Sequence, residues 1–114
     1  MELSVTQLDQ GCLVMIQGDI DTATAPTLQN ALSEELDKGN INAVVDMSKV
    51  RYVSSMGLRV FLSHLKKLRT SNGRLLLSGA NKLVSDVFVM SGFSNYLEML
   101  PDTESAKKQL ESQG

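Results

Sequence analysis

Short apolar runs alternate with longer segments of helical periodicity, and this alternation constrains the fold of the 114-residue chain more than any other feature. The apolar runs are "CLVMI", "INAVVDM" and "RLLLS". Runs of this length and composition are typical of strands buried on both faces. Apolar residues in the segments between them recur every three to four positions, as in amphipathic helices. Strands that are joined through helices lie parallel, so the pattern predicts an α/β fold.

The first strand departs from this pattern. "LSVTQL" alternates apolar and polar residues, and only a short turn separates it from the run "CLVMI". Such spacing favours an antiparallel hairpin. The predicted order is therefore β-β-α-β-α-β-α-β-α in one domain over residues 1–114. We expect a mixed, mostly parallel sheet with an N-terminal antiparallel hairpin and about four helices, mainly on one face.

Cap and turn residues set the expected helix boundaries. Thr24 is a plausible N-cap of the first helix, with Pro26 in its first turn and Gly39 after its end. Residues 48–53, "SKVRYV", are expected to connect the third strand to the second helix, and Tyr52-Val53 within them also has the pattern of a strand end. Asn81 should open the third helix, with Gly92 closing it. The residues expected to face inward on that helix are Leu83, Val84, Val87 and Phe88.

The C-terminal segment is expected to add a short strand and a last helix. "YLEML" is the expected final strand. Pro101 and Asp102 should start a polar helix, for which Ala106 and Leu110 are the apolar anchors.

Composition excludes several classes of protein. The net charge of -2 gives no electrostatic basis for binding nucleic acid. The single cysteine, Cys12, rules out an internal disulfide and is typical of a reducing compartment. The N-terminus lacks the pattern of a signal peptide, and no apolar run approaches the ~20 residues of a membrane helix. We therefore expect a cytoplasmic protein that is a monomer or a weak dimer, without direct contact with nucleic acid or membrane.

The sequence holds no recognisable catalytic set. Its single histidine, His64, is expected to be a surface or half-buried helix residue, and one His with one Cys cannot provide zinc-site spacing. Phosphate-binding glycine loops and the G-x-S-x-G elbow are absent from the sequence. We therefore predict that the chain is not an enzyme and uses no cofactor or metal.

The stretch "RYVSSMGLRVFL", residues 51–62, places two adjacent hydroxyl groups where the second helix should begin. Ser54 or Ser55 can cap the helix by accepting hydrogen bonds from the N–H groups of its first turn. The same free N–H groups and the helix dipole also favour an anion. A serine at this position can therefore be a cap, a phosphorylation site, or one of each.

Two carboxylates are candidates for the same region. Asp21 follows the second strand in "GDID", and Asp46 is expected to end the central strand in "VVDMS". The carboxyl ends of parallel strands meet at one edge of a sheet, where ligands and partners gather. Asp46 is equally well explained as a turn or cap residue.

The chain resembles the STAS domain family, the fold of bacterial anti-sigma factor antagonists. Three segments carry the resemblance: "VMIQGDIDTATAPTLQNAL", "AVVDMSKVRYVSSMGLRVFL" and "GRLLLSGAN". Together they match the family pattern of a G-[ED]-[ILF]-D turn and a D-[LM]-S stretch that leads through S-x-G-L into a helix. The resemblance extends over nearly the whole chain.

The resemblance implies a phosphorylation switch. The family's phosphorylated residue lies two positions before the motif glycine, here Gly57, so the matching residue is Ser55. Many phosphorylated members carry aspartate just before the target serine, whereas this chain has Ser54, which is a competing site. The resemblance also matches Asp21 to the family's acidic loop residue and Asp46 to the aspartate of the central strand.

Further contacts with a partner are expected close to the serines. Met56 lies beside them, and Arg59 lies one turn beyond Ser55. Arg59 has three open interpretations: it pairs with a phosphate, it contacts the partner, or it is a solvated arginine. The expected partner-binding set is Asp21, Asp46, Ser54, Met56, Gly57 and Arg59.

The resemblance implies two classes of partner for the switch. An unphosphorylated antagonist binds an anti-sigma factor, often a serine kinase, and so releases the sigma factor. Phosphorylation by that kinase reverses the effect, and a PP2C-type phosphatase resets it. The alternative is a STAS subunit docked on a transport ATPase of the lipid-transport type, in which Ser55 is part of a contact surface or a simple cap.

Overall fold

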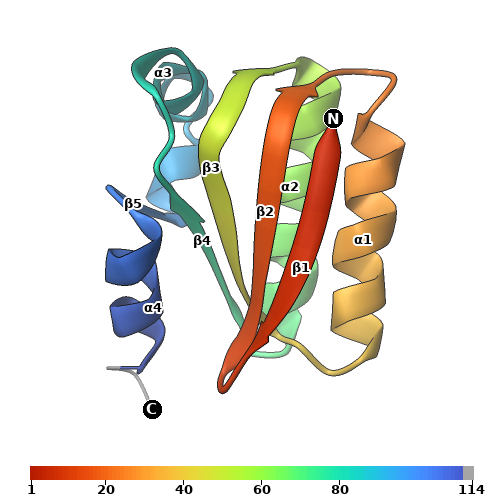
Figure 1. The fold of residues 1–114 in the computed structure, drawn as a ribbon, viewed down its shortest axis with the longest axis vertical. Helices are drawn as coiled ribbons and strands as arrows, with labels where there is room; N and C mark the ends of the chain where they lie inside the picture. The colour runs from red at the N-terminus through yellow and green to blue at the C-terminus, as the bar shows by residue number, and fades with distance from the viewer. Residues whose placement is uncertain (112–114) are drawn as a thin grey trace.

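The alternating segments fold into one five-stranded sheet with four α-helices in residues 1–111, the part of the chain that this computed structural model describes (Figure 1). The strands are β1 (Glu2–Leu8), β2 (Gly11–Ile20), β3 (Asn42–Val53), β4 (Arg74–Ser78) and β5 (Glu98–Leu100). The helices are α1 (Ala25–Asp37), α2 (Ser55–Thr70), α3 (Lys82–Met90) and α4 (Thr103–Glu111), with a short 3-10 turn, η1, at Phe93–Asn95.

The strand order is β1-β2-β3-β4-β5. β1 pairs antiparallel with β2, and all the other neighbours pair parallel. The predicted mixed sheet with an N-terminal hairpin is therefore confirmed. Parallel pairing brings the carboxyl ends of β2 and β3 to the same edge, where the chain enters α1 and α2 (Figure 1).

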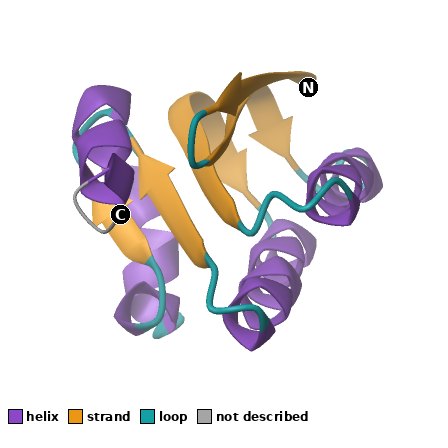
Figure 2. Cartoon of the chain, turned by 90° about the horizontal axis from the view of Figure 1, so that it is seen from below, coloured by secondary structure: helices purple, strands orange, loops and turns teal. Residues whose placement is uncertain are grey.

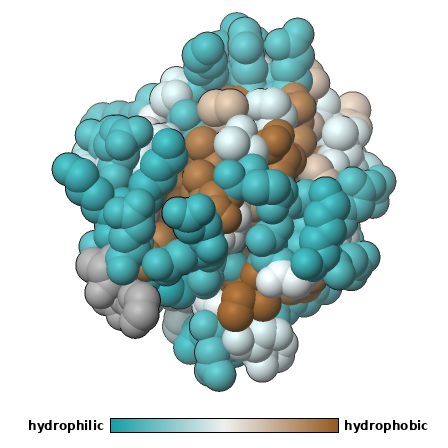
Figure 3. Space-filling view, turned by 60° about the horizontal axis from the view of Figure 1, so that its bottom comes forward, coloured by the Kyte–Doolittle hydropathy of each residue, from teal (hydrophilic) through white to brown (hydrophobic). Residues whose placement is uncertain are grey.

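Three helices cover one face of the sheet, and α4 covers part of the other (Figure 2). Buried side chains from α1, α2 and α3 form the main core with the inward residues of the strands. A smaller core lies under α4, and its fully or nearly buried members are Leu13, Val44, Leu76, Ala106 and Leu110. Ala106 and Leu110 are thus the apolar anchors that the sequence predicted. A band of apolar side chains runs between hydrophilic ones in the space-filling view of Figure 3.

The helix boundaries follow the cap residues closely. Asn81 is the N-cap of α3, and its side chain accepts a hydrogen bond of 2.8 Å from the Val84 N–H. Thr24 occupies the N-cap position of α1, but its hydroxyl does not cap that helix. Gly39 and Gly92 follow the ends of α1 and α3, and both have positive φ angles, which glycine adopts without strain.

The third strand is longer than predicted. Residues 48–53 were expected to be a connection, but β3 continues through them and pairs with the end of β2. The strand ends at Val53, which confirms the interpretation of Tyr52-Val53 as a strand end. Two irregularities in that pairing change the period of burial, so that only Val50 and Val53 point inward after Met47. The residues between them are polar and exposed. This half of the strand therefore has the composition of a loop, and the sequence pattern did not mark it as a strand.

The inward face of α3 is narrower than predicted. Val84 and Phe88 are buried, and the Phe88 ring packs edge-on against Phe61 with 5.6 Å between ring centroids. Leu83 is 61% exposed, and Val87 is half-buried. A nine-residue helix that contacts the core along a single i, i+4 row buries only that row, so the prediction for Leu83 was wrong.

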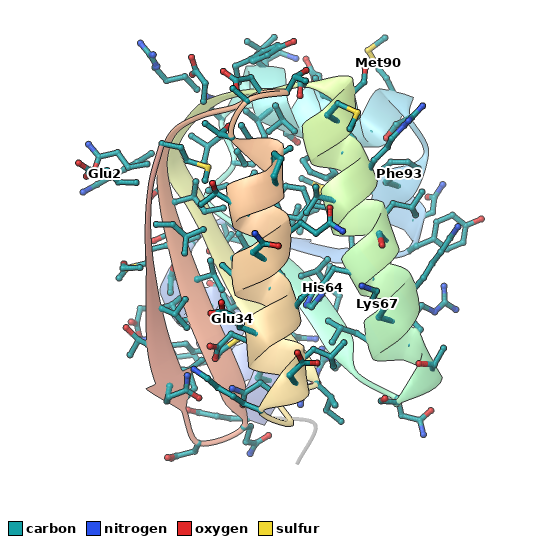
Figure 4. All side chains as sticks on the ribbon, turned by 90° about the vertical axis from the view of Figure 1, so that its right-hand side faces the viewer. Glu2, Glu34, His64, Lys67, Met90 and Phe93 are labelled. Carbon is teal, nitrogen blue, oxygen red and sulfur yellow. The ribbon has the colours of Figure 1, made fainter. Side chains whose placement is uncertain are left out.

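His64 is a core residue rather than a surface residue. Its side chain is 4% exposed and lies between α1 and α2 (Figure 4), near Leu32 and Val60. Burial and, to a smaller extent, the nearby positive charge of Lys67 together lower the pKa of His64 to about 4. The imidazole is therefore neutral in the folded chain at pH 7. No helix in residues 1–111 is both long and apolar enough to cross a membrane.

The buried histidine makes stability depend on pH. Between the ordinary pKa of 6.5 and the folded value of about 4, the unfolded chain binds a proton that the folded chain excludes. The stabilisation by neutral His64 is complete above about pH 6.5 and declines as the pH falls toward 4, by at most about 3 kcal/mol.

Urea unfolding of the wild type and of His64→Gln at several pH values between 4 and 7 measures this loss. The wild type should lose more stability over the window than the variant, which shares all the carboxylates but lacks the imidazole. Parallel pH profiles would contradict the assignment.

Candidate functional site

The site is built where β2 and β3 end side by side. Ile20 pairs with Val53, and the Ser54 N–H donates a hydrogen bond of 2.8 Å to the Ile20 carbonyl oxygen. The loop that begins at Asp21 therefore lies next to the start of α2. The sequence predicted this proximity from the parallel arrangement of the strands, and the structure confirms it for Asp21.

The two serines have different environments. Ser54 is the N-cap of α2: its backbone is extended, and its Oγ accepts a hydrogen bond of 3.2 Å from the Gly57 N–H. The Ser54 carbonyl oxygen accepts the Leu58 N–H at 2.9 Å, which begins the helical hydrogen-bond series. Ser55 is the first helical residue and is exposed, and its hydroxyl has no hydrogen-bond partner within residues 1–111. The structure thus gives the cap to Ser54 and leaves the Ser55 hydroxyl free.

Gly57 allows α2 to approach the end of β2. A Cβ atom at this position would lie 2.8 Å from Ile20 Cγ2 and 2.9 Å from Val53 Cγ1. Such distances are too short for any real side chain. The absence of a side chain at Gly57 is therefore a packing requirement of the junction.

Asp21 is fixed by the residue that was predicted to cap α1. Its Oδ1 accepts hydrogen bonds from the Thr24 N–H at 3.0 Å and from the Thr24 hydroxyl at 3.1 Å, and the Asp21 N–H donates to Thr24 Oγ1 at 2.9 Å. The hydrogen bonds from Thr24 hold the pKa of Asp21 below its usual value. The loop therefore presents a fixed negative charge beside α2. The spacing D-x-x-T was the signal in the sequence for this closed loop.

Met56 and Arg59 complete the exposed surface at the start of α2. Met56 is 41% exposed, and Arg59 is also exposed. A hydroxyl, a thioether and a guanidinium therefore share the first turn and a half of the helix, on a surface that solvent reaches.

Asp46 lies outside this site. It was expected to end the central strand, but it is the fifth residue of the 12-residue strand β3. At about 3.3 Å per residue, the eight positions along the extended strand place it roughly 25 Å from Ser54. The prediction of its position was wrong because β3 continues past the end of β4, which pairs with β3 only as far as Asp46.

The surroundings of Asp46 indicate a role in the fold. Its Oδ1 accepts the Ser48 N–H at 2.9 Å. Burial acts to raise the pKa of Asp46, but hydrogen bonds to Ser48 and Thr103 outweigh this effect and lower it. Thr103 is the first residue of α4 and bonds Ser78 Oγ at 2.9 Å, so Ser78 ties the start of α4 to the end of β4 near Asp46. Its part in partner binding stays a prediction.

A hollow on the outer side of β1, β2 and β3 lies away from the serines. It has a volume of about 500 Å³ and is lined by residues of β1, β2 and β3, among them Asp46, Ser48 and Lys49. Within residues 1–111, no group of three or more His, Cys, Asp and Glu side chains is placed to hold a metal ion.

One buried oxygen next to the site was not anticipated. Asp19 Oδ1 has no hydrogen-bond partner among the described residues, whereas its Oδ2 pairs with Arg51 at 3.3 Å. The Asp19 backbone oxygen lies 3.0 Å from Thr24 Oγ1 and shares the single hydroxyl proton with Asp21 Oδ1, which joins this pair to the Asp21 loop. Nothing in the local composition distinguishes Asp19 from Asp21, the other acidic residue of "GDID".

Comparison with known proteins identifies the family. The model of the STAS domain matches residues 2–106. The chain belongs to the STAS domain family. The STAS chain is 34% identical over 106 residues to BtrV of Bordetella bronchiseptica, a protein described as a candidate anti-sigma factor antagonist, with 93% of this chain and 91% of that protein covered. It is 33% identical over 86 residues to the anti-sigma-B factor antagonist of Listeria monocytogenes, with 75% of each chain covered.

The fold itself agrees with a solved structure of the family. The unphosphorylated form of the anti-sigma factor antagonist SpoIIAA superimposes with a TM-score of 0.85 at 17% identity, and 97% of each chain is covered. At this identity the likeness shows the fold alone. The relatives above are named for regulatory binding rather than for a reaction, which agrees with the prediction that the STAS chain is not an enzyme.

The two serines should differ in their effect on stability. Ser54→Ala removes the cap of α2 and should lower the free energy of unfolding by about 1 kcal/mol. Ser55→Ala removes an exposed hydroxyl without a partner and should change it by less than about 0.5 kcal/mol. Urea unfolding at pH 7 measures both values. A larger loss for Ser55→Ala than for Ser54→Ala would reverse the assignment of the cap.

Gly57→Ala should destabilise the chain despite the better helix propensity of alanine. The added methyl group meets Ile20 and Val53, and overpacking of this kind costs about 1–3 kcal/mol. Ser63→Ala, at an exposed position of the same helix, is the matched control and should be nearly neutral. A Gly57→Ala variant as stable as the wild type would show that the junction has room for a side chain.

Proposed function

We propose that the STAS chain is an anti-sigma factor antagonist controlled by phosphorylation of Ser55. In the unphosphorylated state it binds an anti-sigma factor that is also a serine kinase, and this binding releases the sigma factor. The names of its relatives support the antagonist role. The observation that carries the choice of residue is the exposed and unbonded Ser55 hydroxyl beside a Ser54 hydroxyl that is committed to the cap.

The proposed chemistry takes place on the partner's active site. The kinase transfers the γ-phosphoryl group of ATP to Ser55 Oγ, the hydroxyl loses its proton, and ADP leaves. A PP2C-type phosphatase hydrolyses the ester and returns the serine and inorganic phosphate. The STAS chain is therefore a substrate in both steps.

The proposed contact surface is the exposed start of α2 together with the neighbouring loop. Ser55, Met56 and Arg59 supply the exposed groups, and Asp21 supplies a fixed negative charge. Phosphorylation adds about -1.5 to -2 charges to this surface. A partner that fits the neutral hydroxyl would then have to bury an anion next to Asp21, which weakens the complex.

The alternative is a STAS subunit docked on a transport ATPase. In that case Ser55 is part of a constitutive contact and no phosphate is exchanged. The relatives from Bordetella and Listeria do not favour this alternative, because both are named as antagonists of anti-sigma factors.

Phosphorylation by the cognate kinase tests the proposal. Incubation with the kinase and Mg-ATP, followed by intact-mass analysis and peptide mapping, should find one phosphate on Ser55 in the wild type and in Ser54→Ala, and none in Ser55→Ala. A phosphate on Ser54 would contradict the assignment of the residue. A chain that stays unmodified and copurifies with a transport ATPase would contradict the switch itself.

A further inference from the structure

Arg59 is an exposed cation that has no partner in an ion pair within residues 1–111. The arginine at the end of β3, Arg51, is already paired with Asp19. The arginine near the end of α2, Arg69, lies over the ring of Tyr96 at 5.8 Å. Arg59 is thus free to bind an anion, whereas these two arginines have partners in the fold.

Helix geometry places Arg59 over Ser55. The two residues are four positions apart on α2, so their Cβ atoms lie about 5–6 Å from each other. Side chains on a helix lean toward its N-terminus and cover the preceding turn. The long side chain of Arg59 therefore reaches back toward Ser55. An anion four residues before a cation is also the more stabilising order on a helix.

Other charges near the start of α2 favour the same partner for a phosphate. The carboxylate of Asp21 lies in the adjoining loop and repels an anion. The next cation along α2 is Lys66, eleven positions after Ser55 and about 16 Å further along the helix axis. Arg59 is therefore the cation of α2 that a phosphate on Ser55 can reach.

We propose that Arg59 binds the phosphate of phosphorylated Ser55. The planar guanidinium donates two N–H groups to phosphate oxygens, as arginine does at other phosphate sites. The modification then changes the surface in two ways, since it adds an anion and also draws an exposed cation back over the first turn. A partner that uses the free Arg59 loses that contact at the moment of phosphorylation.

The contact can be measured on the phosphate itself. Phosphoserine is introduced at position 55 of the full chain during translation, and the ³¹P NMR signal is followed from pH 4 to 8. A nearby cation favours the dianion, so the phosphate should titrate about 0.3 pH units lower in the wild type than in Arg59→Gln.

Two control variants separate this contact from general charge effects. Lys66→Gln makes the same change in net charge on the same helix and should leave the midpoint at the wild-type value. Arg59→Lys should restore part of the shift, and about 0.5 M salt should reduce the difference between wild type and Arg59→Gln. Equal midpoints in the wild type and Arg59→Gln at low salt would overturn the proposal.

The inference rests on the proposed function, because it takes Ser55 as the modified residue, but the two fail separately. The NMR experiment needs no kinase. A midpoint that depends on Arg59 in a chain whose Ser55 the kinase ignores would preserve the contact and refute the switch. If the kinase phosphorylates Ser55 but the phosphate titrates at the same pH with and without Arg59, the switch is supported and the Arg59 contact is refuted.

Discussion

The parallel pairing of the last residues of β2 and β3 is the constraint on which the site depends. The Ile20 carbonyl oxygen accepts the Ser54 N–H, and Gly57 packs against the Ile20 side chain without an intervening Cβ. One residue of β2 therefore fixes both the position and the approach of α2. The chain leaves β2 directly into the Asp21 loop, so the same pairing also sets that loop beside the helix. The register of β2 against β3 therefore determines where the site lies, and its polar side chains take their positions from that register.

At this junction the two adjacent serines can serve different purposes. Ser54 satisfies the Gly57 N–H and belongs to the fold, whereas Ser55 has no hydrogen bond and belongs to the surface. A phosphate on Ser55 leaves the cap intact, and an anion at a helix N-terminus is itself stabilising by about 0.3–1 kcal/mol. A switch at Ser55 would therefore act by changing the charge of the exposed surface, because the phosphate does not destabilise the fold.

Hydrophobic periodicity predicted the helices and strands in which the same burial period holds from one end to the other. The order of the elements along the chain, the mixed sheet and the Asn81 cap all follow from local pattern. The second half of β3 could not be predicted, because irregular pairing with β2 changes its burial period. Its length moved Asp46 away from the site. His64 was missed for a different reason: the packing of α1 against α2 decides its burial, and no single segment encodes that contact.

The segments that resemble the STAS family contain residues that make contacts within the fold and residues that are exposed. Asp46, Asp21 and Gly57 each make contacts within the fold: Asp46 bonds the Ser48 N–H in β3, Asp21 closes the loop after β2, and Gly57 allows the approach of α2. Substitution at these positions alters the fold and the site together. Ser55 and Arg59 are exposed, and the fold uses neither side chain in an ion pair or hydrogen bond within residues 1–111. Substitutions at these two positions can therefore change the exposed surface while the junction beneath them stays the same.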